Sequence, residues 1–78
     1  MKTLIVTCQG QVRFLVTNHP DYRFSKLQSQ MPVAIHNFGV TDQKAKEIKL
    51  RFAHLAITDS EWFHLTEEFE QYLSGVVS

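Results

Sequence analysis

The chain has 78 residues and a formal net charge of zero, and 44% of its residues are hydrophobic. This length holds only one hydrophobic core and this composition excludes a disordered chain, so residues 1–78 are predicted to form a single domain. Cys8 is the only cysteine, which excludes an internal disulfide, and the apolar run Leu4 to Val6 is too short for a signal peptide or a membrane span. The sequence therefore predicts a cytoplasmic protein with no membrane contact.

The charges are unevenly distributed along the chain. Residues 1–57 carry all eight Lys and Arg and three acidic residues, a net charge of +5, whereas residues 58–78 carry five acidic residues and no basic one, a net charge of −5. This asymmetry is typical of a polyanion-binding face beside an acidic end, or of two segments that neutralise each other. The second interpretation is slightly favoured, because a small dedicated nucleic-acid-binding protein usually has a net positive charge.

The first seventeen residues predict a β-hairpin. Lys2 to Cys8 is rich in Thr, Ile and Val, as strands are. Gln9-Gly10-Gln11 allows a tight turn, since glycine adopts a positive φ without strain. Val12 to Thr17 then alternates its side chains between two faces, as a returning strand does.

A helix is predicted after the hairpin. Asn18-His19-Pro20-Asp21 offers a capping residue, a proline in the first turn and an acidic residue near the helix N-terminus. Phe24, Leu27 and Met31 follow the helical period and predict one buried stripe. Pro32 ends this helix, because the residue before a proline avoids the α region.

A third strand and a second helix are expected next. Val33 to Phe38 alternates along its length and Gly39 closes it, while Thr41 and Asp42 offer a cap and a first-turn acid. The buried face predicted for the second helix consists of Ala45, Ile48, Phe52 and Leu55. Leu50 points the opposite way, and it is a candidate contact with a partner chain, although a single exposed leucine is also common on protein surfaces.

Two interpretations remain open for the last segment. Thr58-Asp59-Ser60-Glu61 matches a capping box and predicts one helix from Asp59 to Leu73. In the alternative, Glu61 to Phe63 is extended and Thr66 caps a shorter helix. Either way, the expected fold is α+β, with a three-stranded, mainly antiparallel sheet flanked by helices in the order ββαβαα.

Three sequence patterns resemble the GIY-YIG nuclease superfamily, in its small phage and bacterial branch. They are Asp21-Tyr22-Arg23-Phe24 followed by Lys26-Leu27-Gln28 and Pro32, the run Lys46 to Ala53 ending in Arg51-Phe52-Ala53, and Glu61-Trp62-Phe63 followed by Leu65-Thr66. The resemblance covers about residues 3–74 and favours the extended Glu61 to Phe63.

The resemblance implies catalytic roles that this chain largely lacks. In the family, one of the hairpin tyrosines acts as base toward the attacking water, a first-helix arginine stabilises the phosphate and a second-helix glutamate holds a divalent metal. Here the hairpin has no tyrosine, and Ala45 stands at the register expected for the glutamate. Arg23 and Glu47 are the remaining catalytic candidates, so the resemblance implies a scaffold that has lost catalysis.

Binding is therefore the predicted mode of action. The candidate nucleic-acid contacts are basic residues, namely Arg13, Arg23, Lys26, Lys44, Lys46, Lys49 and Arg51. No metal site or cofactor is expected, since the four histidines match no metal-ligand spacing, and Mg²⁺ enters only if the chain is a nuclease.

The functional prediction is a small non-catalytic GIY-YIG-like protein, of phage or mobile-element origin, that binds nucleic acid or a host protein and can form a homodimer. The first alternative is a divergent metal-dependent GIY-YIG endonuclease. The second is a purely structural homo-oligomer.

Overall fold

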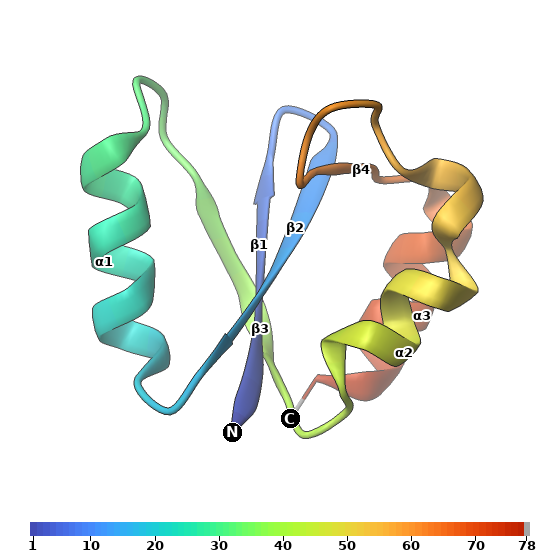
Figure 1. Cartoon of the computed structure of the whole chain (residues 1–78), viewed down its shortest axis with the longest axis horizontal. Coiled ribbons are helices and arrows are strands. Elements are labelled where there is room, and N and C mark those ends of the chain that lie inside the picture. The colour runs from blue at the N-terminus through green and yellow to red at the C-terminus, as the bar shows by residue number, and fades with distance from the viewer. Residues whose placement is uncertain (78) are drawn as a thin grey trace.

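A four-stranded antiparallel sheet lies between two layers of helices (Figure 1). The computed structural model describes residues 1–77. The elements in chain order are β1 (Lys2–Cys8), β2 (Gln11–Thr17), α1 (Pro20–Gln30), β3 (His36–Thr41), α2 (Ala45–Arg51), the 3-10 turn η1 (Ala53–Leu55), β4 (Phe63–His64) and α3 (Glu67–Val76). The sheet order is β3-β1-β2-β4. The predicted α+β class is confirmed, but the predicted number of three strands and the order ββαβαα are wrong, because β4 adds an edge strand before the last helix.

The predicted hairpin is confirmed. β1 pairs with β2 from Lys2↔Thr17 to Cys8↔Gln11, which leaves a two-residue turn. Gln9 has a φ of 50° and Gly10 a φ of 78°. Two successive positive φ values match the right-handed twist of the strands, so this turn fixes the register between β1 and β2.

Both faces of the sheet are covered, because its strands send apolar side chains in both directions. The larger core lies under α2 and α3 and consists of Ile5, Val12, Phe14, Ala45, Ile48, Phe52, Phe63, Phe69 and Leu73. The smaller core lies under α1 and consists of Leu4, Val6, Cys8, Leu15, Leu27 and Ile35. Figure 1 shows α1 alone on one side of the sheet and α2 with α3 on the other.

The last segment follows the extended interpretation. Phe63 belongs to β4 and pairs with Val12 of β2. Thr66 caps α3, and its hydroxyl accepts a hydrogen bond from the backbone N–H of Phe69 at 3.2 Å. Trp62 packs against the smaller core while Phe63 lies in the larger one, since successive side chains of an extended segment point to opposite faces.

The third strand begins later than predicted. β3 starts at His36 rather than Val33, and Gly39 lies within it rather than at its end. The side-chain amide of Gln28 holds the preceding residues as a loop, because it donates to the carbonyl of Val33 at 3.0 Å and accepts from the N–H of Ile35 at 2.8 Å. Residues 33–35 have the alternating pattern of a strand, but the Gln28 side chain from α1 holds them as a loop.

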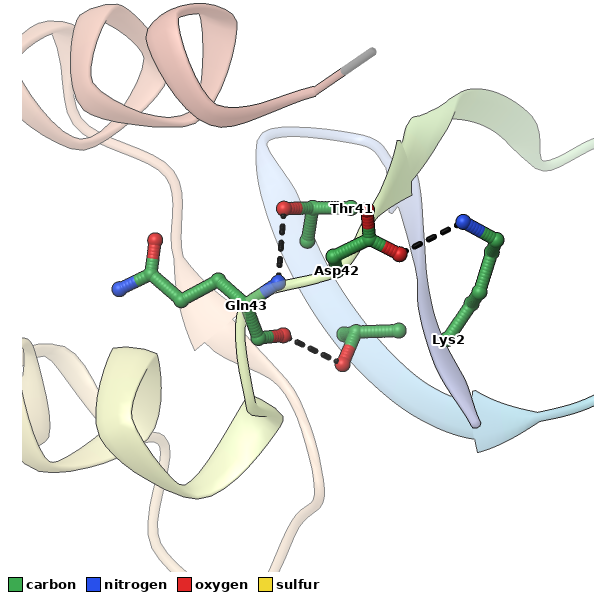
Figure 2. Close-up of polar contacts among 5 residues, drawn as sticks. Lys2, Thr41, Asp42 and Gln43 are labelled. Atoms are coloured by element: carbon green, nitrogen blue, oxygen red, sulfur yellow. Dashed lines mark hydrogen bonds and ion pairs between the residues drawn. The ribbon is translucent and has the colours of Figure 1, made fainter.

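The start of the second helix was also predicted wrongly. α2 begins at Ala45, and neither Thr41 nor Asp42 caps it. Figure 2 shows the alternative: the hydroxyl of Thr41 accepts from the N–H of Gln43 at 3.1 Å, and Asp42 pairs with Lys2 at 2.6 Å. These bonds fix the connection between β3 and α2 to the start of β1.

The same ion pair predicts a pH effect. The hydrogen bond from Lys2 and then its positive charge hold the pKa of the Asp42 carboxyl below its ordinary value. A lowered pKa in the folded state stabilises the fold above the unfolded-state pKa, and this contribution is lost as the pH falls through the folded-state pKa. We expect an NMR titration of Asp42 to give a pKa below that of an unstructured aspartate, and the Lys2→Met variant to restore the ordinary value. An unchanged pKa in Lys2→Met would contradict this assignment.

Candidate nucleic-acid interface

The predicted basic contacts do not form one surface. Arg23 and Lys26 lie on α1, on one side of the sheet. Four of the others lie on or directly before α2, on the other side, and these are Lys44, Lys46, Lys49 and Arg51. A single ligand surface therefore cannot include all seven residues.

The α1 side has a shallow hollow at the point where β2 leads into the helix. It is lined by Thr17, His19, Tyr22, Arg23 and Lys26 and has a volume of about 320 Å³. A neighbouring hollow of about 340 Å³ shares Tyr22 and Lys26 with it and extends along α1 to Ser29. We call these two hollows together the α1 groove.

The geometry of the α1 groove follows from helical spacing. His19, Tyr22, Arg23 and Lys26 stand at positions i, i+3, i+4 and i+7, which place their side chains on one face of a helix. The stripe of α1 that meets the sheet is different: Leu27 is buried, and Phe24 packs against the smaller core. The groove side chains are therefore available to a ligand while α1 stays anchored.

The chemistry of the α1 groove suits an anionic, partly aromatic ligand. Arg23 offers a planar guanidinium that can bind phosphate oxygens in a bidentate manner, and Lys26 adds a second positive charge. The Lys26 ammonium lies 5.8 Å from the centroid of the Tyr22 ring. Tyr22 is 59% exposed, so its ring is accessible for stacking against a planar group.

Arg13 has a structural role instead. Its guanidinium pairs with the Glu61 carboxylate at 2.6 Å, and its side chain is only 21% exposed. Its Nε atom is buried and has no hydrogen-bond partner among residues 1–77. The ion pair ties β2 to the residues before β4, and it offsets the charge that Arg13 would otherwise present to a polyanion.

The two catalytic candidates do not come together. Arg23 extends from α1 and Glu47 from α2, on opposite sides of the sheet (Figure 1). Both residues are exposed. No group of three or more His, Cys, Asp or Glu side chains that could hold a metal ion lies among residues 1–77. A phosphate bound at Arg23 would therefore have no carboxylate of Glu47 beside it.

Leu50, the predicted partner contact, lies on the outer surface of α2 and is 69% exposed. It belongs to neither core. The structure thus confirms that Leu50 points away from the protein interior, on the side of the sheet opposite the α1 groove.

Comparison with protein-family models, with curated proteins and with solved structures found no match to this chain. Within residues 1–77, no helix has the length and apolar character needed to cross a membrane.

Five residues that line the α1 groove were not predicted as ligand contacts, and these are Thr17, His19, Tyr22, Ser25 and Ser29. The signal for His19 and Tyr22 was present, since both share the helical face of Arg23 and Lys26. Thr17 had no such signal, because its approach to α1 depends on the turn between β2 and the helix.

Proposed function

We propose that this protein is a non-catalytic binder of single-stranded nucleic acid, built on a scaffold that descends from GIY-YIG nucleases. The observation that carries the proposal is the α1 groove, which places Arg23 and Lys26 beside the exposed ring of Tyr22. Cationic side chains that follow a phosphate backbone, together with an aromatic ring on which a base stacks, are the usual combination in proteins that bind single strands.

The α1 groove is a better polyanion site than the more numerous charges of α2. Glu47 is exposed among the basic residues of α2, and α3 on the same side of the sheet carries Glu67, Glu68 and Glu70 in its first turn. These carboxylates repel phosphates. The groove on the other side has only Asp21 close to it in sequence, so a strand bound there lies away from the acidic helix.

The lineage explains why binding without cleavage is proposed. Arg23 on α1 stands where the resemblance expects the phosphate-binding arginine, and the short strand that begins at Phe63 leads into a closing helix, as the resemblance implies. The hairpin, however, has Phe14 and Leu15 where a tyrosine motif is expected. Phe14 is buried in the larger core, and the hairpin has no tyrosine whose phenol could activate water.

Fluorescence anisotropy with a labelled single-stranded oligonucleotide of about twelve nucleotides tests the proposal. We expect measurable binding that weakens steeply with added salt. The double variant Arg23→Ala with Lys26→Ala should reduce the slope of log K against log[salt] by about 1.4, because each lost phosphate contact on a single strand accounts for about 0.7. The Tyr22→Ala variant should weaken binding by about 1–3 kcal/mol without changing that slope.

The matched control removes two positive charges outside the groove, in Lys44→Ala with Lys46→Ala, both exposed, and should leave the slope nearly unchanged. Equal losses in the two double variants would mean that net charge alone drives binding, which contradicts the groove. Cleavage of the strand with Mg²⁺ or Mn²⁺ that disappears in Arg23→Ala would contradict the non-catalytic part and establish the nuclease alternative.

A further inference from the structure

The two helices on the far side of the sheet from the α1 groove form a layer with opposite charges. α2 and α3 lie side by side, since the rings of Phe52 and Phe69 stack with centroids 4.0 Å apart and the Arg51 guanidinium lies 4.7 Å from the centroid of the Tyr72 ring. The charges of α2 are mainly basic: Lys46 and Arg51 are exposed, Lys49 is half-buried, and Glu47 is the one exposed acidic residue. Those of α3 are all acidic: Glu67, Glu68 and Glu70.

The charged side chains of α2 and α3 form no ion pair within residues 1–77, although Arg51 lies against the Tyr72 ring and Glu67 accepts a hydrogen bond from Gln71 at 3.5 Å. Two ion pairs of 4.0 Å or less occur among residues 1–77, Lys2–Asp42 and Arg13–Glu61, and neither includes a charged residue of α2 or α3. Only Arg13–Glu61 joins the basic segment to the acidic one. Apart from this pair, the two segments are not joined by ion pairs within residues 1–77, so no ion pair neutralises the charges of α2 and α3.

We propose that this layer, the α2–α3 face, binds a second copy of the same chain. A second copy offers both complementary charges, because its basic α2 can meet the acidic α3 of the first copy and its acidic α3 can meet the basic α2. The whole chain has a net charge of zero, so no overall repulsion opposes association near neutral pH. Leu50, 69% exposed on the outer surface of α2, provides an apolar side chain at the contact.

The charges select one of two symmetric arrangements. Two such layers can stack face to face about a two-fold axis that lies between them. This axis can run parallel to the helices or perpendicular to them. The axis across the helices places α2 on α2 and α3 on α3, so that like charges meet. The axis along the helices places α2 on the α3 of the partner and repeats this contact twice, as a two-fold interface requires.

This dimer goes beyond nucleic-acid binding and does not depend on it. The α1 groove and the α2–α3 face lie on opposite sides of the sheet (Figure 1). A dimer through the helical layer therefore leaves both grooves exposed on its outer sides. Two grooves on one particle would also raise the avidity for a long strand over that for a short one.

A charge-reversal pair tests the dimer by sedimentation equilibrium at low salt. We expect the wild-type chain to sediment at twice the monomer mass and to dissociate as salt is added. Lys46→Glu with Lys49→Glu makes both helices acidic, and Glu67→Lys with Glu70→Lys makes both basic. Each double variant alone should weaken self-association at least about tenfold, because like charges then meet at both contacts. An equimolar mixture of the two should restore a dimer.

Two further variants keep the test decisive. Leu50→Glu changes an exposed position outside both cores, so it should weaken the dimer while circular dichroism shows an unchanged fold. Arg23→Glu with Lys26→Glu alters the net charge equally on the α1 side and should leave the dimer mass unchanged. A wild-type monomer at about 100 μM in low salt, a mixture that stays monomeric, or assemblies larger than a dimer would each overturn the proposal. None of these masses depends on nucleic acid, so the two proposals fail independently.

Discussion

Replacing Phe69 by alanine is expected to lower the free energy of unfolding by about 3–5 kcal/mol. Phe69 is completely buried and lies at the centre of the larger core. Its ring stacks on Phe52 at 4.0 Å and lies 5.8 Å from the ring of Phe14 and 6.3 Å from that of Phe63. The variant would therefore lose the burial of one aromatic side chain and leave a cavity lined by three others.

Urea and thermal denaturation measure this effect. In a domain of 60–100 residues, a loss of 3 kcal/mol lowers the Tm by roughly 12–24 °C, which is enough to leave a small domain partly unfolded at room temperature. Val16→Ala is the control, because Val16 is 54% exposed and its truncation should change stability by about 0.5 kcal/mol or less. A loss below about 1.5 kcal/mol for Phe69→Ala would mean that the four rings do not form the centre of the core.

The elements that the sequence predicted well are those whose signals are local. The hairpin turn depends on two adjacent residues, Gln9 and Gly10. The cap of α3 is also local, because the Thr66 hydroxyl accepts from the backbone N–H three residues later, but the competing capping box at Thr58 to Glu61 left two interpretations open. Neither signal needs information from a distant segment. The buried face of α2 is also a local pattern, and Ala45, Ile48 and Phe52 are buried as expected.

The elements that the sequence predicted wrongly depend on contacts between distant segments. β4 has two residues, too few to show the alternation by which a strand is recognised. The start of β3 is delayed by Gln28, whose amide binds the loop after α1. Thr41 and Asp42 carry the composition of a helix start, but Thr41 ends β3 and Asp42 lies in the bend after it, where their contacts to Gln43 and Lys2 hold them.

The candidate site was also predicted where the signal is local and missed where it depends on contacts between distant segments. The sequence identified Arg23 and Lys26 because both belong to a recognisable helix, and the structure places them in one groove. The sequence could not show that α1 and α2 lie on opposite sides of the sheet. This arrangement divides the basic residues between two surfaces, and it also separates Arg23 from Glu47. This separation follows from the order in which the strands pair, which no local pattern encodes.

Replacing Gly39 by alanine is expected to lower the free energy of unfolding by about 2–4 kcal/mol, for two separate reasons. Gly39 has a φ of 156°, which side chains rarely adopt. A Cβ atom at this position would also lie 2.9 Å from Cγ1 and 3.0 Å from Cβ of Val77, whose short branched side chain packs against the larger core. Gly39 stands beside the register shift between β1 and β3, so neither strand can move freely to relieve the contact.

A double-mutant cycle with Val77→Gly separates the two reasons. Val77→Gly removes the side-chain atoms that a new Cβ would meet, while the backbone of Gly39 keeps its φ. We expect Gly39→Ala to lower stability by about 1–3 kcal/mol in this background, which is the part due to the backbone. The difference between the two backgrounds then measures the steric contact between β3 and the end of α3. Equal losses in both backgrounds would show that Val77 yields without resistance, and no loss in either would show that β3 does not need glycine at this position.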